Sequence, residues 1–219
     1  SNGPFSSKSI GGIMKNTPNL KIYRRYAPIY DSLMRFWTAA PRRKAVELLK
    51  LKTGEQLLVP GVGTGLDLPN LPAGVCVTAV DLSPAMLQQA RHKRQELVGF
   101  NVMDGQVLAL PDGCFDALLL NLILSVVPDG PIAMQEAWRV LKPGGRIAIF
   151  DKFLPEGSRL SGFRRFAGWL IRQIGTDPNR RFREMIQNIP DALVPVDIPS
   201  VLYGQYRLIL MIKPVTTTK

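Results

Sequence analysis

The sequence predicts an α/β fold, a mostly parallel β-sheet with helices on both faces, from two observations. The apolar run Leu57–Pro60 stops at a glycine-rich turn, Gly61–Gly65, and a second apolar run, Val75–Val80, ends on Asp81. Strand-like and helix-like runs then keep alternating as far as Ile149, which is typical of successive βαβ units. A chain of 219 residues is long enough for one such domain with a full core and short for two.

The glycine turn and the aspartate have the spacing of a nucleoside-binding site. Glycines at the end of a buried strand allow a tight turn and bring backbone N–H groups close to a ligand. An acidic residue that closes the next strand, here Asp81, can accept both hydroxyls of a ribose. The dinucleotide fingerprint needs a later third glycine beside the pyrophosphate, but Leu66 follows Gly65. A nucleoside without phosphate, such as S-adenosylmethionine, fits this pattern better.

The composition indicates a globular protein of a reducing compartment. Hydrophobic residues make up 46% of the chain and the mean hydropathy is +0.05, which favours a folded, soluble domain over disorder. Uncharged apolar runs are shorter than the roughly 20 residues that span a bilayer. Cys76 and Cys114 are not spaced as metal ligands, so we expect no metal site, two free thiols and a cytoplasmic location.

The net charge of +11 is concentrated near the N-terminus, where residues 1–52 carry +9. One interpretation is a solvated basic face that aids solubility. The other is attraction to anionic lipid headgroups or to an acidic substrate. Residues 1–18 have no apolar period, and we expect a flexible lead that begins with the remnant of an expression tag.

The predicted single domain covers residues 19–219 and begins with a helical lid at residues 20–52. Apolar residues recur at helical spacing from Ile22 to Trp37, and Pro28 predicts a bend. We expect Pro41 to open a further helix and Gly54 to end it. The inward-facing residues of that helix are predicted to be Ala45, Val46, Leu48 and Leu49.

After Asp81, Ser83-Pro84 predicts a helix start, with serine as the N-cap and proline at the first helical position. This helix is expected to run to about Gln95 with Met86, Leu87 and Ala90 facing inward. His92 lies on its polar face and is expected at the surface rather than as a catalytic base.

Two more strands are predicted by apolar runs. Phe100–Met103 is expected to be the third strand, followed by Asp104, and Ala117–Leu120 the fourth, followed by Asn121. The stretch 193–201 and the stretch 206–212 are expected to form a final antiparallel hairpin.

The stretch Leu141-Lys142-Pro143-Gly144-Gly145 follows a predicted helix, about 80 residues after the glycine turn. Pro143 stops the helix and the glycines permit a reversal before a β-branched strand. In these motifs, and over about residues 26–152, the chain resembles the class I S-adenosylmethionine-dependent methyltransferases. The resemblance implies a Rossmann-like, doubly wound sheet of seven strands, mostly parallel with an antiparallel C-terminal strand. It also implies the N-terminal helical lid and a helical insertion at about residues 155–188.

The resemblance further implies which residues form the site. Expected contacts of S-adenosylmethionine are Tyr30, Gly61, Gly63, Thr64, Gly65, Asp81, Leu82, Asp104, Gly105, Gln106 and Asn121. For the methyl acceptor, the resemblance implies a contact with Tyr26. Asp151 and Asp177, as polar residues near the expected mouth of the site, and Arg180, from the arginine cluster of the insertion, are further expected contacts. Two alternatives stay open: the tyrosines could pack a helix onto the core, and Asp104 could simply cap a turn.

Residues 59–66 and the tyrosine-containing stretch 26–31 are most similar to the ubiquinone/menaquinone methyltransferases and the phospholipid N-methyltransferases. The chain departs from that group at Val59, where an acidic residue usually stands and orients the methionine end of the cofactor. The stretch Asn121-Leu122-Ile123-Leu124 lacks the Asn-Pro-Pro-Tyr pattern of enzymes that methylate nucleobase amines. A nucleic-acid substrate is therefore disfavoured despite the basic charge.

We expect in-line methyl transfer to a small-molecule or lipid-like acceptor. Clustered arginines in the expected insertion interleave with apolar residues, which predicts peripheral contact with an anionic membrane. No residue is assigned as a catalytic base, because amines and carbon nucleophiles need little or no deprotonation. Two other classes stay open: a protein of this fold that binds the cofactor without catalysis, and an RNA methyltransferase. Oligomeric state has no signature in the sequence.

Overall fold

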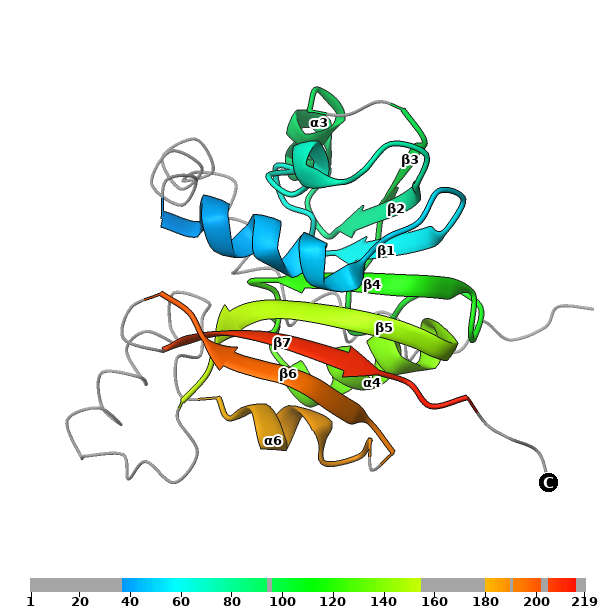
Figure 1. The fold of residues 1–219 in the computed structure, drawn as a ribbon. Coiled ribbons are helices and arrows are strands. Elements are labelled where there is room, and N and C mark those ends of the chain that lie inside the picture. Colours follow the sequence, from blue (N-terminus) through cyan, green and yellow to red (C-terminus); the bar gives the residue numbers. More distant parts are fainter. Residues whose placement is uncertain (1–36, 94–95, 155–179, 190, 202–204, 216–219) are drawn as a thin grey trace, which may run out of the picture.

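The structure is a computed structural model of the 219-residue chain, and it describes residues 37–93, 96–154, 180–189, 191–201 and 205–215 (Figure 1). Several features predicted from the sequence lie outside the described residues. They are the flexible lead, the bend at Pro28, the residues Tyr26, Tyr30 and Asp177, and most of the insertion.

The described residues contain a seven-stranded sheet with the strand order β3-β2-β1-β4-β5-β7-β6 (Figure 1). Strands β1 to β5 are mutually parallel where they pair, and β7 is antiparallel to both β5 and β6. This confirms the predicted fold class and the final hairpin. The strands are β1 (Gln56–Pro60), β2 (Cys76–Asp81), β3 (Val98–Val102), β4 (Phe115–Asn121), β5 (Leu141–Lys152), β6 (Leu193–Pro199) and β7 (Tyr206–Ile212).

Burial explains why the central strands form where they do. In β4, every residue except Asp116 is buried, and in β1 every residue except Gln56 is buried. Such continuous apolar runs are typical of parallel strands that are covered on both faces. Strand β6 has no buried residue and carries Pro195 and Pro199, as expected of an edge strand, where a missing N–H costs no ladder hydrogen bond.

Helices cover both faces of the sheet and form two separate cores. One core joins the sheet to a helix at residues 37–49, the 3₁₀ turn η1 (Leu68–Asn70) and α3 (Pro84–Arg91). The other joins the opposite face to α4 (Gly130–Val140) and α6 (Phe182–Ile186). Figure 1 shows the blue helix in front of β1 and β4, and α4 behind the sheet.

The N-cap of α3 is confirmed, because Ser83 Oγ accepts a hydrogen bond from Met86 N at 3.4 Å. The three inward residues of α3 are buried and His92 is exposed, as predicted. The helix ends at Arg91, however, so the prediction that it reaches about Gln95 is wrong.

Two boundary predictions for the first described helix are also wrong. The helix is continuous across Pro41 from residue 37 onward, so Pro41 does not open it. Proline lacks a backbone N–H, and this helix continues through residue 41 without that donor. The helix ends at residue 49, and Lys50, with φ 45°, takes the left-handed position expected at Gly54.

Residues 141–145 already belong to strand β5, whereas the sequence predicted a reversal before the strand. Strand β5 starts at Leu141, directly after α4, and Leu141 pairs with Phe115. The pairing of β4 with β5 shifts its register between Phe115 and Ala117, which accommodates the reversal. Gly144, within this segment, has φ 77°. Sheet pairing therefore begins at Leu141, six residues before the β-branched run that starts at Ile147.

The face between α4 and the sheet yields a stability prediction. Met134 is fully buried there, whereas Ile132, on the same helix, is 44% exposed. We expect Met134→Ala to lower the free energy of unfolding by about 2–5 kcal/mol, because it leaves a cavity. Ile132→Ala should change it by less than about 0.5 kcal/mol. Urea denaturation of both variants measures this, and equal losses would contradict the packing described here.

Candidate functional site

The polar residues predicted from the sequence gather at one edge of the sheet. Pro60 of β1 pairs with Val80 of β2, and Asp81 pairs with Val102 of β3, so these strands end side by side. Gly61, Asp81 and Asn121 lie at the ends of β1, β2 and β4, and Asp104 follows β3. In open α/β sheets, ligands bind at the carboxyl ends of the strands. This edge is the candidate site.

The turn after β1 requires glycine for two different reasons. Gly61, Gly63 and Gly65 have φ values of 63°, 55° and 80°, a region that side chains disfavour. A Cβ at Gly61 would lie 2.5 Å from Ile123 Cδ1, and one at Gly65 would lie 2.9 Å from Ala90 Cβ. At Gly63 the nearest described atom would be Gly61 O at 4.0 Å. Gly61 and Gly65 therefore permit close packing against Ile123 and Ala90, whereas Gly63 leaves open space above the turn.

Asp81 holds the turn in place. Its carboxylate accepts hydrogen bonds from Gly63 N at 2.8 Å and from Ser83 N at 2.9 Å. Burial raises the pKa of Asp81, although the backbone donors Ser83, Gly63 and Leu82 oppose the shift. Each carboxylate oxygen has more than one acceptor position, so Asp81 can take further donors from a ligand while it keeps the turn closed.

The loop after β3 is tied to the loop after β4. Gln106 N donates to Asp104 Oδ1 at 2.9 Å, and the Gln106 side chain donates to the same carboxylate. Gln106 Oε1 in turn accepts from Asp129 N at 2.8 Å. Asp104 thus caps the turn in the structure, as the alternative interpretation expected, and its carboxylate still lies at the site edge.

Asn121 has a buried acceptor with nothing bound to it. Its Nδ2 donates to Asp67 Oδ1 at 2.8 Å, whereas its Oδ1 has no hydrogen-bond partner among the described residues. Asn121 is only 5% exposed. A buried acceptor without a donor costs free energy, so this atom is suited to a ligand that brings a donor.

Sequence reasoning missed the residues that hold Asn121. Asp67 Oδ2 accepts from Arg42 Nη1 at 2.7 Å, and Arg42 Nε donates to Thr38 Oγ1 at 3.1 Å. All three side chains are buried. One signal could have found them, because Arg42 lies three, four and seven positions before Ala45, Val46 and Leu49. A cation on that apolar face needs a buried partner.

Val59 fills the position where an acidic residue was expected from the resemblance. It is 1% exposed and packs in the core on the side of the helix at residues 37–49. It supplies no acceptor to the site. Buried polar groups at this edge come instead from the hydrogen-bonded side chains of Arg42, Asp67 and Asn121.

Two residues predicted to touch the acceptor, Asp151 and Arg180, support the loop after β4. Asp151 is fully buried and accepts from Ser125 N at 3.1 Å and Lys152 N at 2.7 Å. The Arg180 guanidinium donates to the carbonyls of Leu124, Val127 and Pro128. Both therefore hold residues 124–128 in place, and their contact with the acceptor stays a prediction.

Backbone strain occurs at this edge, and two free thiols lie outside it. Leu122, directly after Asn121, has φ 59°, and backbone strain of this kind concentrates at functional sites. Cys76 and Cys114 are free thiols. Within the described residues, no group of three His, Cys, Asp or Glu side chains is placed to hold a metal ion.

Comparison with known sequences gives one family. A family profile described as a methyltransferase domain matches residues 58–149. The phosphatidylethanolamine N-methyltransferase of Cereibacter sphaeroides is 32% identical over 187 residues, which is 78% of this chain and 91% of that protein. A demethylmenaquinone methyltransferase of Tropheryma whipplei is 32% identical over 169 residues, covering 72% and 70%.

Comparison with solved structures agrees on the fold. A chain from the complex between the Haloferax volcanii Trm112 methyltransferase activator and its methyltransferase superposes with a TM-score of 0.70. The match covers 91% of this chain and 99% of that chain at 18% identity. At this identity the likeness concerns the fold alone.

The buried ion pair yields a second prediction. The side chains of Arg42 and Asp67 are 9% and 3% exposed. Asp67→Ala leaves Arg42 buried without its counter-charge and should lower the free energy of unfolding by about 3–5 kcal/mol. In the control Asp112→Ala, the lost partner of Arg139 is 80% exposed, so at most about 1 kcal/mol should be lost. Chemical denaturation measures the free energy of unfolding of both variants. A loss of about 1 kcal/mol or less for Asp67→Ala would contradict the buried ion pair.

A third prediction concerns pH. Burial raises the pKa of Asp151 above the ordinary aspartate value of 3.8. Between pH 3.8 and the higher pKa of the folded protein, the unfolded chain loses the Asp151 proton first. The contribution of Asp151 to the free energy of unfolding therefore falls as pH rises through this window. Asp151→Asn removes the titration. Relative to the wild type, the variant should therefore become more stable as pH is raised from about 4 to about 7. Unfolding free energies measured across this range test the sign, and a constant difference would contradict it.

Proposed function

The chain belongs to the methyltransferase family, and we propose that its cleft binds S-adenosylmethionine and delivers the methyl group to a lipid-like acceptor, a phospholipid or a quinone. The observation that carries the proposal is the edge at which the glycine turn, the Asp81 carboxylate and the unpartnered Asn121 Oδ1 meet. The open turn, the Asp81 carboxylate and the buried Asn121 Oδ1 suit the adjoining parts of a nucleoside that carries an amino acid through its sulfur atom.

The residues present fit this cofactor. Asp81 has acceptor capacity for two ribose hydroxyls beyond the backbone donors it already binds. The space at Gly63 admits a ligand close to backbone N–H groups. The loop of Asp104, Gly105 and Gln106 supplies a carboxylate and backbone groups for the adenine amino group, and Leu82 an apolar side chain beside Asp81.

Asn121 is the proposed acceptor for the ammonium group at the methionine end. Because Nδ2 donates to Asp67, the amide is held in one orientation, and Oδ1 is the atom left for a ligand. In our proposal Asp67 and Arg42 are positioning residues that replace the acidic side chain absent at Val59. The lid tyrosines, Tyr26 and Tyr30, remain proposed contacts of the acceptor and the cofactor.

The cofactor, when bound, supplies a methyl group already activated on a sulfonium centre, which an acceptor atom displaces in line. The chain's own contribution is alignment. Holding two reactants in attack geometry is worth roughly 7–11 kcal/mol of barrier. The loop after β4, fixed by Asp151 and Arg180, supplies the rigid wall beside Asn121. No described residue needs to act as a base if the acceptor is an amine or an activated carbon.

A lipid-like acceptor is supported by the relatives' names and by the charge of the chain. Both relatives are named for lipid-like substrates, and residues 1–52 carry most of the net charge of +11. Trp37 is 60% exposed at the first described turn of this basic region, and tryptophan favours membrane interfaces.

The described residues include no helix with the length and apolarity of a membrane span. We propose peripheral contact with an anionic membrane, and cytoplasmic location stays a prediction.

The test separates the proposed function from its two alternatives. Calorimetry with S-adenosylmethionine should give a binding isotherm, and tritiated methyl groups should transfer to phosphatidylethanolamine or to a demethylated quinone. Binding without transfer to any lipid would favour a non-catalytic binding protein. Transfer to RNA, with strongly salt-dependent affinity, would favour an RNA methyltransferase. Absence of binding at millimolar cofactor would refute the proposed cofactor.

The fourth prediction uses the open space above the turn. Gly63→Ala puts a methyl group where no described side chain lies, at a φ of 55°. We expect about a tenfold or greater rise in the Kd for S-adenosylmethionine, with a loss of only about 1–2 kcal/mol of stability. Gly99→Ala is the matched control, because its Cβ would make ordinary contacts at 3.9 Å. It should change neither the Kd for S-adenosylmethionine nor the stability. Calorimetry and denaturation on the same samples measure both quantities.

A further inference from the structure

Two side chains of helix α4 hold the backbone of the loop after β3. Glu136 Oε2 accepts a hydrogen bond from Leu108 N at 2.8 Å. Arg139 donates through Nη2 to Leu108 O at 2.9 Å and through Nη1 to Leu110 O at 2.8 Å. Glu136 and Arg139 lie three positions apart, on one side of the helix. We call these two residues the α4 clamp.

The two residues of the α4 clamp also hold each other. Arg139 Nε donates to Glu136 Oε1 at 2.8 Å, and Arg139 Nη2 donates to Glu136 Oε2 at 2.9 Å. Arg139 Nη1 also donates to Asp112 Oδ1 at 2.6 Å, so the guanidinium makes five hydrogen bonds, as many as it has N–H groups. The hydrogen bonds from Arg139 hold the pKa of Glu136 below its usual value. The pair therefore stays ionised at neutral pH.

The clamped segment continues directly from the part of the loop at the candidate site. Val107 N donates to Asp104 O at 3.0 Å. Gln106 binds the Asp104 carboxylate and also accepts from the backbone of Asp129, the N-cap of α4. Leu108 is 4% exposed and packs in the core on the α4 face of the sheet. Residues 104–108 are thus attached to α4 at two separate points.

The same loop borders the glycine turn. A Cβ at Gly105 would lie 3.2 Å from Ile123 Cδ1 and 3.8 Å from Pro60 Cβ. Ile123 is also the side chain that a Cβ at Gly61 would meet. A displacement of the loop would therefore change the position of the Asp104 carboxylate relative to the glycine turn.

We propose that Glu136 and Arg139 are positioning residues for the adenine ring of the cofactor, acting through the loop that they hold. The inference rests on the proposed function, in which Asp104 and the backbone after it bind the adenine amino group. A site that hydrogen-bonds a ligand group rejects the analogue that lacks this group. Such rejection requires the acceptor to stay within hydrogen-bonding distance and angle. The α4 clamp supplies this constraint from outside the cleft.

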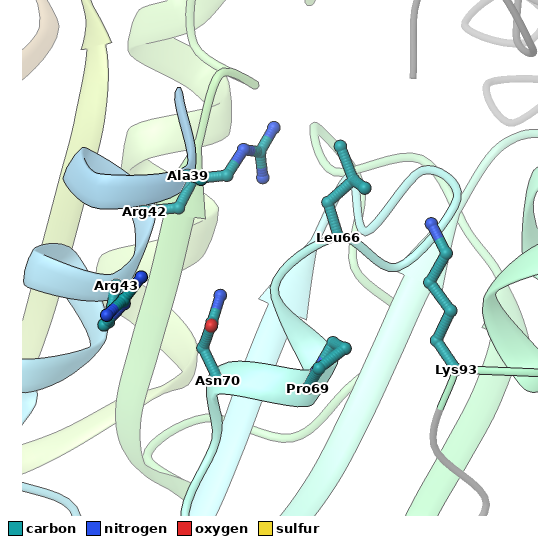
Figure 2. A pocket seen from close by; sticks show the side chains of 7 residues that line it. All are labelled: Ala39, Arg42, Arg43, Leu66, Pro69, Asn70 and Lys93. Atoms are coloured by element: carbon teal, nitrogen blue, oxygen red, sulfur yellow. The ribbon is translucent and has the colours of Figure 1, made fainter. Parts of the chain in front are cut away.

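A cavity beside the glycine turn is lined by other parts of the chain. It has a volume of about 340 Å³ and lies between the helix at residues 37–49 and the segment that follows the glycine turn (Figure 2). No residue of α4 or of the stretch 104–112 lines it. Arg43, an exposed residue of this lining, is therefore a suitable control arginine outside the α4 clamp.

The test is calorimetry on the full chain with two ligands, S-adenosylhomocysteine and S-inosylhomocysteine, in which an oxygen replaces the adenine amino group. The ratio of their Kd values reports recognition of this edge of the base, because the rest of the two ligands is the same. A general loss of stability weakens both ligands alike and leaves the ratio unchanged. We expect the wild type to bind S-adenosylhomocysteine about tenfold or more tightly than the inosine analogue.

Two variants loosen the α4 clamp in different ways. Glu136→Gln keeps an acceptor for Leu108 N but loses the bidentate pair, and Arg139→Lys keeps the charge but loses the planar fork. We expect each to reduce the Kd ratio about fivefold or more. Asp112→Ala removes only the 80% exposed partner of Arg139, and Arg43→Lys makes the same exchange outside the α4 clamp. Both controls should keep the ratio within about twofold of the wild type.

Three results would overturn the proposal. The first is an unchanged ratio in both clamp variants while the wild type prefers adenine, and it would leave the proposed function intact. The second is an equal fall of the ratio in either control. The third is a wild type that does not distinguish the two ligands. If the wild type binds neither of them, the proposed cofactor is refuted as well.

Discussion

The buried ion pair of Arg42 and Asp67 joins the parts of the molecule on which the proposed reaction depends. Arg42 comes from the helix before β1, Asp67 follows the glycine turn, and Asn121 ends β4. Charges removed from water are stable only in close, well-formed geometry. The pair therefore holds a helix, a turn and a strand end in one arrangement, and it leaves the Asn121 carbonyl oxygen oriented for a ligand.

The same edge is organised before any ligand binds. Asp81, the residue expected to hold a ribose, already accepts hydrogen bonds from the glycine turn and from the start of α3. Burial raises the pKa of Asp81, because desolvation disfavours the charged carboxylate more than the backbone donors stabilise it. Ligand hydroxyls would add donors to a carboxylate that needs them. A site whose polar groups are fixed in advance spends less binding free energy on ordering itself.

The helix at residues 37–49 contributes both to the core and to the candidate site. Arg42 pairs with Asp67, which in turn accepts a hydrogen bond from Asn121 Nδ2. Further along the same helix, Ala45 and Leu49 pack in the core. One helix thus contributes to the core and to the cofactor end of the site.

The strands, the glycine turn and Asp81 could be predicted from the amino-acid order, because strand apolarity, turn chemistry and a carboxylate at a strand end are local properties. The end of the helix was predicted too late, at Gly54, because the helix already stops before Lys50, which has φ 45°. The pairing of Asp67 with Arg42 and Asn121, which lie 25 and 54 residues away along the chain, emerged only in the folded structure. Such partners are chosen by the packing of a helix against a sheet. Spacing along the chain carries no trace of that choice.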